Sequence, residues 1–127
     1  MQAEKVGIEP ALLASLDTAH YTNIEWVDTV KKFGTIREGG QVKLQFNFKN
    51  TGNNALYVIK VHPSCGCTIA AFSDQPVMPG QMGFISAVVN TRYHPGAMHK
   101  TITVKTNTNN KLYQQLAFIG EVVAVSH

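Results

Sequence analysis

The stretch from residue 42 to residue 48 alternates strictly between apolar and polar side chains, and this alternation constrains the fold more than any other feature. Val42, Leu44, Phe46 and Phe48 are separated by single polar residues. Successive side chains of a β-strand point to opposite faces, so the pattern predicts a strand with one buried and one solvated face. We expect this strand to pair in an antiparallel sheet.

Further strand-like segments follow, separated by turn residues. Strands are predicted at residues 56–61, 84–89, 101–105 and 112–123, with turns at residues 50–54, 79–80, 94–96 and 107–110. The segment 84–89 is apolar on both faces, which indicates a central or well-covered strand. Short strands with a turn about every 10 residues predict an all-β sandwich or barrel. The 127 residues suit one domain of ordinary size.

The first 23 residues lack this alternation and form a predicted N-terminal extension, which leaves residues 24–127 as the sandwich domain. Pro10 precedes the segment Ala11–Leu16, and proline is favoured in the first turn of a helix. A short helix would place Leu12, Leu13 and Leu16 on one face. We expect the sandwich to fold without residues 1–20.

Charge and hydropathy argue against two classes of partner. The net charge is +3, but the basic residues are spread along the chain. A nucleic-acid interface needs them gathered on one face, so we expect no nucleic-acid partner. No run approaches the roughly 20 apolar residues of a transmembrane helix. The chain is therefore expected to be cytoplasmic, or exported with its signal removed.

Several elements of this chain occur in an order and spacing typical of one family. The elements are Phe33–Ile36, Phe46–Gly52, Ser64–Thr68, Pro76–Gln81, Lys100–Val104 and Phe118–Val122. Together they resemble the bacterial domain-of-unknown-function 1573 family, which is similar to Hydin-type and major-sperm-protein-like domains. The resemblance implies an immunoglobulin-like antiparallel β-sandwich of about seven strands. It also implies a periplasmic or cell-surface location, and it supplies no established activity and no catalytic residue.

Cys65-Gly66-Cys67 is the main candidate for chemistry. Side chains two residues apart on an extended strand share a face, with Cα atoms about 6.6 Å apart. That separation is near the outer limit for a disulfide, and Gly66 can bend the chain to shorten it. The pair can therefore form a strained, reducible disulfide, bind a soft metal ion, or remain as two reduced structural thiols.

A metal site here would need donors besides the two cysteines. His62 precedes Cys65 by three residues and is the predicted nitrogen ligand, so the candidate metal ligands are Cys65, Cys67 and His62. Three donors fall short of a structural zinc site, which takes four. The further donors that could complete it are His94, His99, Met78, Met82 and Met98. Thioethers together with thiolates would favour copper(I) over zinc.

No motif for enzymatic catalysis is recognisable in the sequence. It has no phosphate-binding loop, no dinucleotide-binding glycine pattern and no nucleophile elbow. We therefore predict a non-enzymatic binding or structural module of an exported protein, without a cofactor. Its partner would be a protein or another envelope component, contacted through loops or a sheet edge. The alternative is a thiol site at Cys65 and Cys67 that binds metal or undergoes thiol–disulfide exchange.

Overall fold

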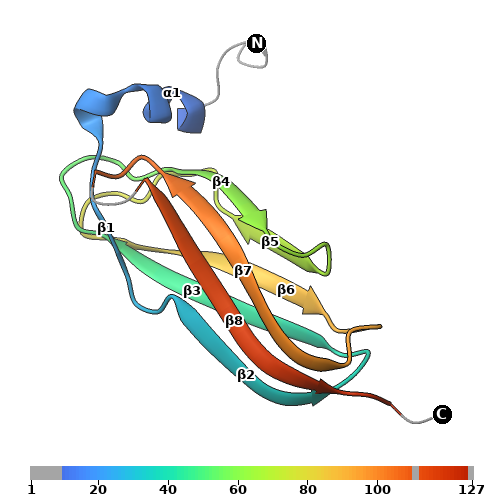
Figure 1. Cartoon of the computed structure of the whole chain (residues 1–127). Coiled ribbons are helices and arrows are strands. Elements are labelled where there is room, and N and C mark those ends of the chain that lie inside the picture. Colours follow the sequence, from blue (N-terminus) through green and yellow to red (C-terminus); the bar gives the residue numbers. More distant parts are fainter. Residues whose placement is uncertain (1–9, 110–111, 126–127) are drawn as a thin grey trace.

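The computed structural model describes residues 10–109 and 112–125 and shows a β-sandwich of two four-stranded sheets (Figure 1). Its strands are β1 (Ile24–Trp26), β2 (Val30–Arg37), β3 (Gln41–Asn50), β4 (Val58–Pro63), β5 (Thr68–Phe72), β6 (Met82–Asn90), β7 (Gly96–Thr106) and β8 (Tyr113–Val123). The helix α1 (Pro10–Leu16) and a 3-10 turn, η2 (Thr18–His20), precede them. The all-β, immunoglobulin-like sandwich expected from the sequence is confirmed.

One sheet has the strand order β1-β3-β6-β5 and the other has the order β2-β8-β7-β4. The described chain thus holds eight strands, where about seven were expected. All pairs are antiparallel except β2 and β8, which run parallel. Residues 27–29 carry the chain from the edge of one sheet to the edge of the other, so β2 joins the second sheet beside its last strand. The purely antiparallel expectation was wrong for this pair.

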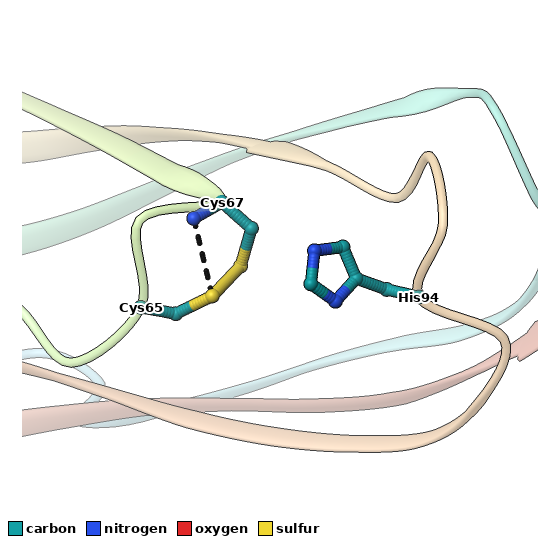
Figure 2. A group of neighbouring side chains, drawn as sticks. All are labelled: Cys65, Cys67 and His94. Atoms are coloured by element: carbon teal, nitrogen blue, oxygen red, sulfur yellow. Dashed lines mark hydrogen bonds between the residues drawn. A yellow bond between two sulfur atoms is a disulfide. The ribbon is translucent and has the colours of Figure 1, made fainter.

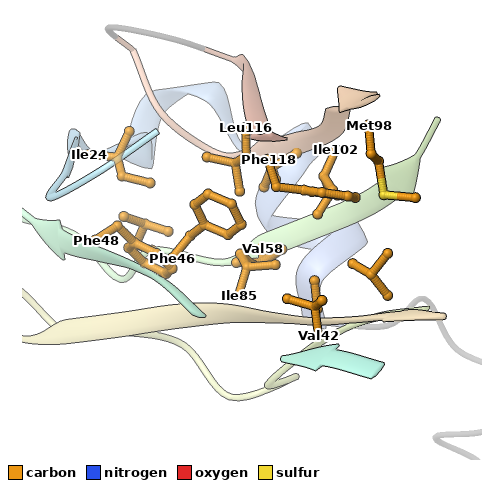
Figure 3. Packing of buried hydrophobic residues seen from close by; sticks show 14 of the residues in the cluster. Ile24, Val42, Phe46, Phe48, Val58, Ile85, Met98, Ile102, Leu116 and Phe118 are labelled. Atoms are coloured by element: carbon orange, nitrogen blue, oxygen red, sulfur yellow. The ribbon is translucent and has the colours of Figure 1, made fainter. Parts of the chain in front are cut away.

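The core lies between the two sheets and is built from the inward faces of alternating strands. Val42, Phe46 and Phe48 of β3 are buried, and Leu44 is partly buried against them. Ile102, Leu116 and Phe118 are among the residues that meet them from the opposite sheet (Figure 3). Burying an aliphatic or aromatic side chain of this size stabilises a fold by roughly 1.5–3 kcal/mol. The predicted burial of one β3 face is confirmed.

Buried polar residues hold the loop between β3 and β4. Asn50 is fully buried, and its amide nitrogen donates to the carbonyls of Asn54 and Val77 at 2.7 and 2.8 Å. Its side-chain oxygen accepts from the hydroxyl of Thr22 at 2.7 Å and from the backbone N–H of Gly52 at 3.0 Å. All four hydrogen-bonding positions of this amide are thereby satisfied. The loop is fixed by one side chain as well as by its own turn residues.

The helix α1 lies beyond one end of the sandwich (Figure 1). None of its residues is buried, and Leu12, Leu13 and Leu16 are each about half exposed or more. Asn54 nevertheless donates its amide to the carbonyl of Tyr21 at 3.1 Å, so the chain is attached to the sandwich immediately after η2. Within the described residues, no helix is long and apolar enough to span a bilayer.

Candidate functional site

Cys65 and Cys67 form a disulfide in the short link between β4 and β5. Pro63 ends β4, and the chain then turns so that the N–H of Thr68 donates to the carbonyl of Cys65 at 3.1 Å. The turn shortens the Cα–Cα distance of the cysteines to 5.1 Å, inside the usual range for a disulfide. Of the three states that the sequence left open, the structure shows the bridged one.

Both cysteines are half-buried and belong to a tightly bonded turn. The backbone N–H of Cys67 donates to Sγ of Cys65 at 3.1 Å, and Sγ of Cys67 lies 3.6 Å from the hydroxyl oxygen of Thr68. The N–H of Asn90, at the end of β6, donates to the carbonyl of Cys67 at 2.8 Å. The turn is therefore anchored to the sheet while its sulfur atoms remain partly accessible to solvent.

His94 approaches the disulfide from the loop between β6 and β7 (Figure 2). A ring nitrogen of His94 and the sulfurs of Cys65 and Cys67 all lie within 4.8 Å of one another. The histidine is exposed, whereas the cysteines are half-buried. Two segments about 30 residues apart in the sequence thus bring two sulfurs and one imidazole to the same point.

The loop that carries His94 is held in an unusual conformation. Tyr93 has a φ of 64°, a left-handed conformation that residues other than glycine rarely adopt. Its N–H donates to the carboxylate of Glu38 at 2.9 Å, and the N–H of His94 donates to the carbonyl of Thr91 at 3.1 Å. The Arg92 guanidinium lies 5.7 Å from the Tyr93 ring centroid. Such conformations persist where surrounding contacts enforce them, and they are enriched at functional sites.

A shallow hollow of about 340 Å³ opens beside the disulfide. Ile69 of β5 and Val88 of β6, which are partners in the sheet register, form its apolar floor. Cys67, Arg92 and His94 also line it. The hollow therefore combines an apolar surface, a cationic side chain and the sulfur–imidazole group.

The structure places the other predicted donors elsewhere. His62 is exposed on β4 and lines a separate hollow with Lys60, Lys105 and Tyr113. Met98 is buried in the core, and Met82 begins β6 at the end opposite Asn90. The donors grouped around the sulfurs in the described residues are thus Cys65, Cys67 and His94, without His62. A metal ion at the two cysteines stays a prediction.

Sequence reasoning did not single out two residues of this corner. Arg92 and Ile69 reach the hollow only because the link after β4 and the loop after β6 meet at the same end of the sheet. Ile69 carried a weak signal, since it is an apolar residue directly after the cysteine motif. Arg92 carried none, because a single arginine in a turn is normally a solvated surface residue.

Solved structures with the same fold come from very different proteins. A protein of unknown function from Porphyromonas gingivalis W83 superposes with a TM-score of 0.69 and 14% identity, over 82% of this chain and 48% of that one. The seventh PapD-like domain of human CEP192 gives 0.62 and 10%, over 84% and 89%. The periplasmic chaperone SfaE gives 0.56 and 9%, over 83% and 61%. At these identities the likeness concerns the fold.

This chain spans about half of the Porphyromonas gingivalis chain, so the whole of that protein is not represented here. No curated protein matches the sequence. A family model does match, over residues 24–122, which is most of the chain and nearly all of the sandwich. The resemblance seen in the sequence motifs is confirmed, and the chain belongs to the family of proteins of unknown function called DUF1573.

Proposed function

We propose that this domain is a non-enzymatic, protein-binding module of an exported bacterial protein, and that its partner docks along β5 and the outer face of β5 and β6. The family resemblance supports export, and the structural neighbours include a periplasmic chaperone. The observation that carries the proposal is the exposure of Ile69, an apolar residue with 72% of its surface in solvent, on an edge strand.

The outer face of this sheet is divided into a polar half and an apolar half. The outward residues of β3 are polar, as expected for a sheet face in water, and include Lys43 and Gln45. The outward residues of β5 and β6 include Ile69, Val88 and Phe84, the last of which is 51% exposed. The strand at 84–89 is central, as predicted, but nothing in the described chain covers its outer face. Exposed apolar patches of this kind mark interaction surfaces.

The strand β5 also offers backbone groups for pairing. It is hydrogen-bonded to β6 on one side and forms the edge of its sheet. The bond from Asn90 N–H to the Cys67 carbonyl fixes which residues face β6, because bonding alternates along an antiparallel pair. By this alternation, the N–H and carbonyl of Ala70 point to the open edge. An extended segment of a partner can add there as a further strand.

Site-specific photo-crosslinking in the cell that produces the protein tests this proposal. A photoreactive side chain at position 69 should join the domain to a partner protein, whereas the same group at Gln45, on the polar half, should not. Ala70→Pro removes an N–H from the open edge without removing a bond to β6, so it should abolish the crosslink from position 69. The thermal unfolding of each variant is measured as a control. Equal crosslinking from both positions would contradict the proposal.

A second function is favoured by the half-buried disulfide beside His94, namely reversible thiol–disulfide exchange. A protein dithiol would supply two electrons and two protons, leaving itself as a disulfide and Cys65 and Cys67 as thiols. Loop-closure entropy does little to hold a bridge between residues two apart, which supports ready reduction. Titration of the folded protein with glutathione buffers, with thiols counted by mass after alkylation, tests this. A bridge that opens only on unfolding would exclude the exchange.

A further inference from the structure

We propose that, once the disulfide is reduced, Cys65, Cys67 and His94 bind one copper(I) ion through two thiolates and one imidazole nitrogen. The proposal rests on the reversible reduction described above, with a protein dithiol as the reductant. Reduction breaks the S–S bond, and binding then releases one proton from each thiol. Oxidation of the pair back to the disulfide removes both thiolates and would release the ion.

The three donor atoms already have nearly the spacing that one ion requires. In a trigonal site with metal–sulfur bonds of about 2.3 Å, the two sulfurs lie about 4 Å apart. Reduction allows the sulfurs to separate from bonding distance toward this value. The His94 nitrogen lies within 4.8 Å of both sulfurs, so it has to move inward by less than about 1 Å. An exposed side chain can make this movement without disturbing the core.

The backbone holds these donors in place while leaving their side chains adjustable. The cysteine turn is fixed by hydrogen bonds from Thr68 to Cys65 and from Asn90 to Cys67, at 3.1 and 2.8 Å. The histidine loop is fixed through Thr91, whose hydroxyl is buried and donates to the Gly40 carbonyl at 2.6 Å. A site built on two anchored segments loses little entropy when it binds, which favours affinity.

The donor set selects copper(I) over zinc for three reasons. Thiolates are soft ligands that favour copper(I). In the part of the chain that the structure describes, no fourth His, Cys, Asp or Glu joins the group, whereas a structural zinc ion takes four ligands. Two thiolates with a monovalent ion also leave one net negative charge, and Arg92 lines the same hollow and can offset it. Two thiolates with a divalent ion would need no such partner.

The test is an anaerobic titration of the whole protein after reduction with a phosphine. Copper(I) is added in competition with a chromophoric copper(I) chelator, and zinc is added to a second sample with a zinc indicator. We expect one copper(I) per chain, absorption at the copper K-edge characteristic of two sulfurs and one nitrogen, and no binding to the oxidised protein. Cys65→Ser/Cys67→Ser should abolish binding. His94→Ala should weaken it at least about tenfold, the lower end of the cost of losing an outer-shell partner.

His62→Ala is the matched control, because His62 is exposed, lies close to the cysteines in sequence and belongs to another hollow. It should leave copper(I) affinity unchanged. Equal affinities of wild type and His94→Ala, an equal loss in His62→Ala, or zinc binding without copper(I) binding would each overturn the assignment. The phosphine separates the two proposals. Copper(I) binding by a protein whose bridge resists thiols would refute only the exchange, and failure to bind by a protein whose bridge opens readily would refute only the metal site.

Discussion

The ring of Phe33 lies directly against Gly120, in the space that a Cβ atom at position 120 would occupy. Gly120 sits opposite Gly34 in the parallel pair of β2 and β8, and the register shifts between Lys32 and Gly34, so that Phe33 is the irregular residue. The Phe33 ring also packs near Phe118, with centroids 6.4 Å apart. A glycine in the last strand therefore provides the room in which an aromatic side chain joins the first strand of that sheet to the core.

Gly120→Ala should destabilise the domain because the added methyl group collides with this ring. Overpacking of this kind costs typically about 1–3 kcal/mol. Gly66→Ala is the control, since a Cβ there meets nothing within 4 Å, and its effect should stay within about 0.5 kcal/mol. The free energies of unfolding are measured with a chemical denaturant. A Gly120→Ala protein as stable as wild type would show that Phe33 can move aside without cost.

The elements that sequence reasoning identified best are those whose patterns arise locally. The alternation from Val42 to Phe48 gave the strand, its buried face and its antiparallel pairing, because the period of a strand is written in the strand itself. Gly120 was recognised as a close-packing point for the same reason. The parallel pairing of β2 with β8 was not recognised, since it depends on where the chain crosses between sheets, and residues 27–29 carry no signal for that crossing.

The candidate site divides in the same way. Cys65 and Cys67 were recognised because two residues of one turn must lie together, and Gly66 indicated the bend that joins them. The histidine beside them was expected to be His62, its near neighbour in sequence, whereas the structure brings His94 there. That approach depends on two loops meeting at one end of the sandwich. Proximity in sequence is a poor guide across such loops, because neighbouring strand residues point to opposite faces.

Asn50→Ala should be among the most destabilising polar substitutions in the domain. It removes an amide that makes four hydrogen bonds and leaves the buried groups around it without partners. An unsatisfied buried group costs about 1–3 kcal/mol, so we expect a loss of at least about 2 kcal/mol. Asn53→Ala is the control in the same loop, because Asn53 is exposed. Similar unfolding free energies for the two variants would mean that the loop is held by its turn alone.

Deletion of residues 1–20 should leave a folded domain with nearly unchanged stability. The helix α1 buries no side chain, and the deletion removes few contacts, among them the bond from the Tyr21 hydroxyl to the Ser15 carbonyl. Deletion of residues 1–23 should cost more, because it also removes Thr22, which is buried and donates to Asn50. Cooperative thermal unfolding is the measurement. An equal effect of both deletions would contradict this placement of the boundary.

Replacement of both cysteines by serine tests whether the bridge serves stability or chemistry. A loop closed by residues two apart contributes only about 1.6 kcal/mol in the chain-entropy model, and both positions are half-buried, so that a serine hydroxyl can stay hydrated. Cys65→Ser/Cys67→Ser should therefore fold, with a melting temperature lowered by no more than roughly 10 °C. The reduced wild type is the control for the loss of the bridge alone, and it should melt close to the serine variant. If the serine variant unfolds while the reduced wild type stays folded, the thiols themselves pack in a way that the fold requires. If both unfold, the bridge is a structural requirement, and neither exchange nor metal binding can be the reason for the pair.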